Sequence, residues 1–173
     1  MVAMAQRRRT RGRGGLARTA AVLGAGAAIG AAGALLGAAA YAAAVLNERT
    51  PDGLLDRYTF SPYETQVQGY EEVSFSTADG VRLAGWWLPQ PASERLVIGL
   101  AGHRSRKDSL LGIGSGLWRA GYNVLLFDWR SRGQSDVAQH SLAYYEQRDA
   151  EAALAYALGR MPAARIGLIG YSM

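Results

Sequence analysis

The sequence predicts an α/β fold: a doubly wound, mostly parallel sheet with an antiparallel hairpin at its N-terminal edge, preceded by one long apolar helix. Residues 19–46 contain no charged residue. Residues 73–88 hold two segments of alternating apolar and polar residues around a tight turn, which is typical of a β-hairpin. From residue 96 onward, short apolar runs alternate with helical segments. This order implies parallel strands joined by right-handed crossovers.

The apolar segment at residues 19–46 is 28 residues long, and a helix needs roughly 20 to cross the hydrocarbon core of a membrane. It contains 14 alanines and five glycines, so seven leucine, isoleucine and valine residues provide most of its transfer energy. We expect a transmembrane anchor here. The alternatives are a cleaved signal peptide with a processing site near residues 42–44, and a non-membrane Ala/Gly-rich leader.

Positive charge gathers in residues 1–18, where six arginines precede the first acidic residue: Arg7, Arg8, Arg9, Arg11, Arg13 and Arg18. By the positive-inside rule we expect a cytoplasmic tail there and the rest of the chain, from Asn47, outside the cell membrane. Without these arginines, 13 basic and 14 acidic residues remain, so the globular part offers no electrostatic case for nucleic-acid binding. The chain has no cysteine, which excludes disulfides, thiolate catalysis and cysteine-ligated zinc.

Residues 47–68 are polar, contain Pro51 and Pro62, and show no sustained period, so we expect a linker there and a domain over residues 69–173. The hairpin comes first, with its turn at Ala78-Asp79-Gly80. Buried strands are predicted over residues 96–101, 122–127 and 166–169. Helices are predicted from about Asp108 to residue 120, despite three glycines, and over residues 142–158, where Ala152, Ala153, Tyr156 and Ala157 form the buried face.

The last predicted strand runs into Gly170-Tyr171-Ser172-Met173, and open α/β sheets place reactive groups at the carboxyl ends of their strands. The segment resembles the G-x-S-x-G nucleophile elbow of the α/β-hydrolases up to its last glycine. The resemblance covers residues 51–173, the first half of such a domain, and is closest to the membrane-anchored serine aminopeptidase-like or lysophospholipase-like branch. It implies that Ser172 is the catalytic nucleophile.

Two upstream loops extend the resemblance. Residues 128–135, Asp128-Trp129-Arg130-Ser131-Arg132-Gly133-Gln134-Ser135, are similar to the family's D-x-R-G-x-G-x-S loop. The resemblance implies that Asp128 and Arg130 pair to brace this loop. Ser131 stands where the family usually has glycine, so a positive φ there would be strained.

Residues 101–104, Ala101-Gly102-His103-Arg104, resemble the family's H-G-x loop, with alanine in place of its common histidine. By this resemblance, the backbone N–H groups of His103 and Met173 form the oxyanion hole.

The family order of the catalytic triad is Ser, then Asp or Glu, then His. The acid and the base are therefore expected after Ser172, and neither His103 nor His140 is expected to be the base. Arg104, Arg106 and Lys107 are interpreted as a solvated basic loop face, with an acidic substrate as the alternative. The four tryptophans are interpreted as packing residues. No metal or cofactor is expected.

These features predict a membrane-tethered serine hydrolase of ester, thioester or amide bonds, acting on a small-molecule, lipid or peptide acyl group through an acyl-serine intermediate. Residues 1–173 alone lack the expected base and acid, so we expect them to be inactive without the rest of the domain. Serine at position 172 argues against dehalogenase and epoxide hydrolase chemistry, which use aspartate there. The alternative is a non-catalytic membrane-tethered piece that binds a partner through an open sheet edge.

Overall fold

The computed structural model describes residues 13–47 and 60–172. The arginines before residue 13, Pro51 in the expected linker and the proposed oxyanion donor Met173 lie outside the described residues. The chain divides into two compact units, Met1–Ala44 and Val45–Met173, and each is described by itself.

The described part of the first unit is helical and belongs to α1, which spans Arg13–Asn47 and so begins six residues before the predicted apolar segment. Its abundant alanine is the residue with the highest helix propensity. Residues Leu23–Val45 form a stretch long and apolar enough to cross a membrane. That criterion concerns length and composition alone, and a signal sequence meets it as well.

The second unit is built on a five-stranded sheet with the order β1-β2-β4-β3-β5. The strands are β1 Glu71–Ser76, β2 Arg82–Leu88, β3 Arg95–Leu100, β4 Asn123–Phe127 and β5 Arg165–Gly170. β1 and β2 form the predicted antiparallel hairpin, and β2 pairs antiparallel with β4. β4, β3 and β5 are mutually parallel, so the predicted mixed sheet with an antiparallel edge is confirmed.

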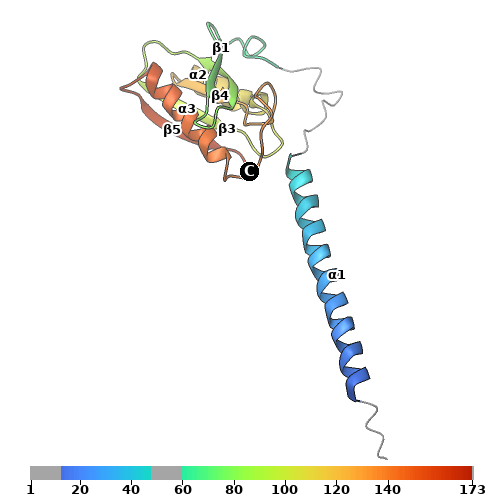
Figure 1. Ribbon diagram of the computed structural model, residues 1–173. Helices are drawn as coiled ribbons and strands as arrows, with labels where there is room; N and C mark the ends of the chain where they lie inside the picture. The colour runs from blue at the N-terminus through green and yellow to red at the C-terminus, as the bar shows by residue number, and fades with distance from the viewer. Residues whose placement is uncertain (1–12, 48–59, 173) are drawn as a thin grey trace, which may run out of the picture. The chain divides into compact units, whose positions relative to one another are not determined.

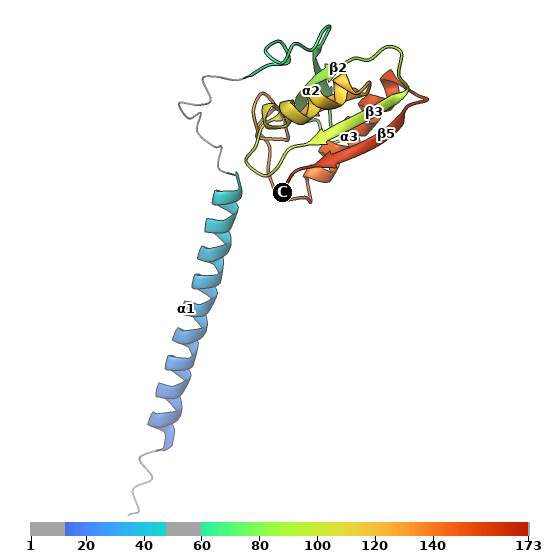
Figure 2. The same ribbon diagram turned by 180° about the vertical axis from the view of Figure 1, so that it is seen from behind.

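Helices cover both faces of this sheet. Figure 1 shows α3 (Glu146–Arg160) across one face, and Figure 2, seen from behind, shows α2 (Leu111–Arg119) across the other. A 3-10 turn, η2 (Lys107–Leu110), precedes α2. A Cβ atom added to Gly114 would lie 2.9 Å from Leu126 Cδ1. This glycine lets α2 approach β4 closely, which explains why a sequence of low helix propensity is helical here.

Helix α3 begins at Glu146, four residues later than predicted. Leu142 and Ala143 have φ values of 55° and 114°, which no α-helix accommodates. The Glu146 carboxylate accepts hydrogen bonds from the backbone N–H groups of Ser141 and Ala143, at 2.9 and 2.7 Å. These bonds fix a turn in front of the helix. Within α3, Ala153 and Ala157 are fully buried as predicted, and the Tyr156 ring stacks on Phe75.

Strand β5 differs from the prediction in its burial. It was expected to be covered on both faces, but Leu168 is 63% exposed. β5 lies at the edge of the sheet, next to β3 alone, and Leu154 and Leu158 of α3 are each about two-fifths exposed. The strand was predicted correctly, and its exposed apolar face agrees with the open sheet edge expected from the sequence.

The fold takes in part of the expected linker. Val67 belongs to the hydrophobic core and is 4% exposed. Arg119, at the end of α2, donates a hydrogen bond to the Thr65 carbonyl. The tryptophans pack as expected: Trp86, Trp87 and Trp129 are buried, and the half-buried Trp118 donates its indole N–H to the Pro89 carbonyl.

Candidate active site

The candidate site lies at the carboxyl ends of two neighbouring strands, β3 and β5. Leu100 at the end of β3 pairs with Gly170 at the end of β5. β3 connects through α2 to β4 on one side of it, while β5 lies on its other side. This is the topological switch point at which open α/β sheets form binding crevices. The loops that leave it carry residues 101–106 and residues 171–172.

Ser172 follows β5 in a left-handed backbone conformation with φ of 60°. For a residue with a side chain this conformation costs roughly 1–2 kcal/mol. A strained strand-to-helix turn of this kind makes a nucleophile side chain project from the sheet. The residue is exposed, and Tyr171 before it donates its backbone N–H to the Leu100 carbonyl at 3.3 Å.

Gly102 brings the loop after β3 against this turn. A Cβ atom added to Gly102 would lie 2.7 Å from the Tyr171 carbonyl oxygen and 3.3 Å from Ser172 Cβ. No larger residue fits without moving one of the two backbones. The loop is fixed further by a hydrogen bond from Ser105 N–H to the Gly102 carbonyl, and by another from the Trp129 indole to the Ala101 carbonyl at 2.6 Å.

His103 follows Gly102 directly, in the loop that lies beside Ser172. The structure thus brings Ser172 and the loop of His103 together, as the sequence predicted. The next residue, Arg104, has φ of 64°. A glycine at a close approach, Gly102, and a left-handed residue two positions later, Arg104, shape this loop.

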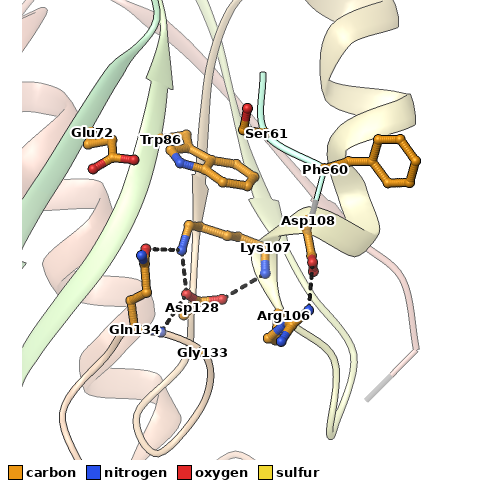
Figure 3. Close-up of a pocket in the computed structure, with 10 residues that line it drawn as sticks. All are labelled: Phe60, Ser61, Glu72, Trp86, Arg106, Lys107, Asp108, Asp128, Gly133 and Gln134. Carbon is orange, nitrogen blue, oxygen red and sulfur yellow. Dashed lines mark hydrogen bonds and ion pairs between the residues drawn. The ribbon is translucent and has the colours of Figure 1, made fainter. Parts of the chain in front are cut away.

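Asp128, at the end of β4, braces the neighbouring loop with a partner that the sequence did not reveal. Its carboxylate accepts hydrogen bonds from the backbone N–H and the ammonium group of Lys107, at 2.8 and 2.6 Å, and from Gln134 N–H at 3.1 Å. Figure 3 shows Lys107 between Asp128 and Gln134. Lys107 is 4% exposed, so its expected place on a solvated basic face was wrong.

Arg130 does not pair with Asp128, contrary to the expectation. Its guanidinium binds Asp149 of α3 at 2.8 and 2.9 Å and Asp79 of the hairpin turn at 3.0 and 3.1 Å. The hydrogen bonds from Arg130, followed by that from Thr77, hold the pKa of Asp79 well below its ordinary range. The spacing of the motif gave no signal for these partners, because they come from two other elements.

Ser131 has φ of 60°, so the strain expected from serine at the family's glycine position is present. Its side chain offsets part of this cost: Ser131 Oγ accepts a hydrogen bond from Ala138 N–H at 2.9 Å and donates one to the Ala138 carbonyl. Its backbone N–H donates to the Asp136 carbonyl at 2.8 Å. The turn therefore holds a serine in a left-handed conformation with the help of its own side chain.

Comparisons with known proteins point the same way. No protein-family model and no curated protein matches the chain. Among solved structures, an esterase from Pyrococcus furiosus is 32% identical, with a TM-score of 0.60 over 66% of this chain and 44% of its own; a second crystal form gives 30%, 0.61, 65% and 46%. An α/β-hydrolase from a Penicillium species is 25% identical, with a TM-score of 0.52 over 58% of this chain and 37% of its own.

The chain belongs to the α/β-hydrolase superfamily. It spans less than half the length of these α/β-hydrolase structures. Its sheet order, its parallel strands and its loops after β3 and β4 are therefore those of one part of an α/β-hydrolase domain.

A cavity of about 360 Å³ lies beside the loop after β4, which Asp128 and Lys107 hold in place (Figure 3). Its lining combines Trp86 of β2 with Lys107 and Asp128, and the Lys107 ammonium lies 4.8 Å from the centre of the Trp86 ring. The lining does not include Ser172. Within residues 13–47 and 60–172, no group of three or more Asp, Glu or His side chains is arranged to hold a metal ion.

Sequence reasoning missed a buried cluster behind the loop of Gly102. The rings of His103 and His140 lie 5.0 Å apart, and His140 Nδ1 lies 3.6 Å from a Glu146 carboxylate oxygen. Burial is the main cause that lowers the pKa of both histidines, and for His103 the charges of Arg132 and Arg104 add to it. No spacing in the sequence connects these residues, since they come from three separate segments.

Proposed function

We propose that Ser172 is the nucleophile of a serine hydrolase that cleaves acyl bonds, with carboxylic esters as the first class to test and thioesters and amides as the others. One observation carries the proposal: Ser172 stands in a left-handed turn at the end of β5 and touches the Gly102 loop at the end of β3. The esterase from Pyrococcus furiosus, 32% identical over 66% of this chain, supports ester bonds as the first choice.

In the proposed reaction, Ser172 Oγ attacks the carbonyl carbon and forms a tetrahedral intermediate, while a general base takes the hydroxyl proton and later passes it to the leaving alcohol. The backbone N–H groups of His103 and Met173 donate to its oxyanion; losing one such donor costs about 3 kcal/mol of transition-state stabilisation in comparable enzymes. The intermediate collapses, the alcohol leaves with a proton, and the acyl group remains on Ser172. Water then attacks the acyl-serine and releases the acid.

Ser172 needs a general base, because an isolated serine hydroxyl is a weak nucleophile. In the family order, the acid and the histidine follow the nucleophile. The chain spans 44% of the esterase, so the activity is proposed for the full-length protein that contains these residues. The reading frame after codon 173 tests this directly. We expect glycine at the next codon, and an acidic residue and a histidine further on.

The reactive serine is tested by labelling the full-length protein with a fluorophosphonate probe. We expect covalent labelling of the wild type and none of Ser172→Ala. Ser74→Ala, which removes an exposed hydroxyl from β1, is the matched control and should label normally. Labelling that persists in Ser172→Ala would show that another residue is the nucleophile. A wild type that is never labelled and a stop codon after 173 would together favour the non-catalytic, partner-binding alternative.

We further propose that α1 anchors the hydrolase in the cell membrane as a single pass, with the N-terminus in the cytoplasm. The support is the 23-residue apolar stretch Leu23–Val45 and the arginines before it. Paired reporters fused after residue 60, one active only in the cytoplasm and one only outside, test the orientation. Signal from the cytoplasmic reporter would reverse it. The mass of the mature protein separates an anchor from a cleaved signal.

A further inference from the structure

The packed rings of His103 and His140 suggest a role for a histidine that the proposed reaction leaves unused. We propose that His140 is a positioning residue: its uncharged ring packs against His103 and holds the backbone N–H of residue 103 in place beside Ser172. The inference rests on the proposed function and adds to it a residue that touches neither the substrate nor the reacting atoms.

The rings of His103 and His140 pack directly against each other. The two ring centres lie 5.0 Å apart with their planes tilted by 53°, a normal packing distance for aromatic rings. His140 is only 5% exposed, so its ring is fixed by the structure around it. His103 is half-buried and immediately follows Gly102. Movement of the His103 ring would therefore move the backbone that touches Ser172.

His140 is held in place through its neighbour Ser141, which binds Glu146. Glu146, the first residue of α3, is 2% exposed. Its carboxylate accepts from the backbone N–H and the hydroxyl of Ser141, both at 2.9 Å, and from Ala143 N–H at 2.7 Å. The residue next to His140 is thus tied to the start of a helix. A chain of contacts runs from α3 through His140 and His103 to the candidate nucleophile.

Charged side chains surround the two histidine rings. Three elements bring charged groups to the pair: the loop after β3 brings Arg104, the loop after β4 brings Arg130 and Arg132, and α3 brings Glu146. Three of these four groups are cations, and burial also disfavours a charged imidazole. Nδ1 of each ring is buried without a hydrogen-bond partner in the described residues. Burial and the repulsion from Arg132 both favour neutral rings, and for His140 they outweigh the attraction of the Glu146 carboxylate, so that the pKa of each ring is lowered.

The test compares His140→Ala with His140→Phe in the full-length hydrolase, using kcat and KM for a carboxylic ester and the rate of fluorophosphonate labelling. At pH 8, Ala removes the ring, so we expect kcat and the labelling rate to fall about tenfold while KM stays within about twofold. The expected fall is smaller than the 10²–10³-fold loss in kcat that follows complete removal of an oxyanion donor, because here the donor is only displaced. Phe keeps a flat ring, so it should stay within about threefold of the wild type.

The pH profile separates positioning from a general structural role. The ratio of the Phe variant's kcat to the wild-type kcat should rise as the pH falls from 8 to 5, because only the wild-type ring becomes charged. The catalytic base titrates in both proteins and cancels from this ratio.

An His140→Ala enzyme that folds and keeps the wild-type kcat would overturn the inference. If the Ala variant does not fold, the Phe variant decides, and a kcat ratio that is constant from pH 8 to 5 overturns it. A wild type that the probe does not label would instead refute the proposed function, and the inference with it.

Discussion

Gly102 and Ser172 lie so close that a side-chain Cβ on the glycine would be 3.3 Å from the serine Cβ and 2.7 Å from the carbonyl oxygen before it. The two residues belong to loops after different strands. Their contact brings the two loops of the candidate site together, which the resemblance to the family had led us to expect.

Replacing Gly102 with alanine should therefore impair the proposed hydrolase activity. The new methyl group must push the loop away from the Tyr171 carbonyl and so displace the proposed oxyanion donor; we expect kcat to fall at least about tenfold. Overpacking of this kind also costs about 1–3 kcal/mol of unfolding free energy. The rate of fluorophosphonate labelling and a thermal melt of the full-length protein measure both effects.

Gly112→Ala is the matched control, because a Cβ there meets nothing within 4 Å. In helix α2 this change should leave labelling unaltered and stabilise the fold by up to about 1 kcal/mol. Equal labelling rates for Gly102→Ala and Gly112→Ala would contradict the importance of the close approach.

The Asp128–Lys107 pair should be one of the more costly ion pairs to break. Both side chains are at most 5% exposed, and removing one partner of a buried pair leaves an uncompensated charge that costs about 3–5 kcal/mol. Asp128→Ala should lower the free energy of unfolding in urea by an amount in this range. Asp136→Ala, which breaks the half-exposed pair with Arg82, should cost about 1 kcal/mol or less. Similar losses for the two variants would count against this ranking.

The left-handed backbone at Ser131 predicts an unusual order of stabilities. Ser131→Gly and Ser131→Ala both lose the hydroxyl that binds Ala138, but only alanine keeps a Cβ at φ of 60°. We expect the glycine variant to be more stable than the alanine variant by about 1 kcal/mol, the reverse of the order in a helix. Thermal melts of the two variants give the comparison, and alanine as the more stable residue would refute it.

Acid should destabilise the fold through the two histidines. The folded protein holds the pKa of His103 and of His140 below the ordinary histidine value, mainly by burial. Below pH about 6.5, the unfolded chain therefore binds more protons than the folded one, and the free energy of unfolding falls as the pH drops toward the folded-state pKa values.

The measurement is the urea midpoint of the full-length protein between pH 7.5 and 5. His140→Phe should show a smaller decrease than the wild type over this interval. The carboxylates of the protein titrate in both the wild type and the variant, so their contribution cancels from the comparison. A decrease of the same size in both proteins would mean that His140 is not responsible.

Much of the fold could be predicted from local patterns. The hairpin, the three apolar runs and the Ala-rich helix each carry their signal within about ten residues, and all five strands formed. The start of α3 was misplaced because Leu142 and Ala143 look helical in sequence, whereas Glu146 fixes a turn through them. The 63% exposure of Leu168 cannot be read from its apolar run alone, because such a run indicates a strand but not the position of that strand in the sheet.

The site was predictable where a motif supplied it and not elsewhere. Ser172, Gly102 and Asp128 lie in short patterns that resemble those of the family. The partners Lys107, Asp149 and Asp79 are distant in the chain, and each looks like an ordinary surface charge in sequence. Their burial depends on the tertiary structure, which one sequence does not reveal.

Arg130 joins three parts of the chain that are remote in sequence: its own loop, Asp79 in the hairpin turn and Asp149 in α3. A guanidinium shared in this way couples the opening of the hairpin to the opening of the helix. In amide hydrogen exchange, the turn at residues 77–81 and the first half of α3 should therefore be protected to a similar degree. Neither segment can open without breaking its ion pair with the buried Arg130 guanidinium.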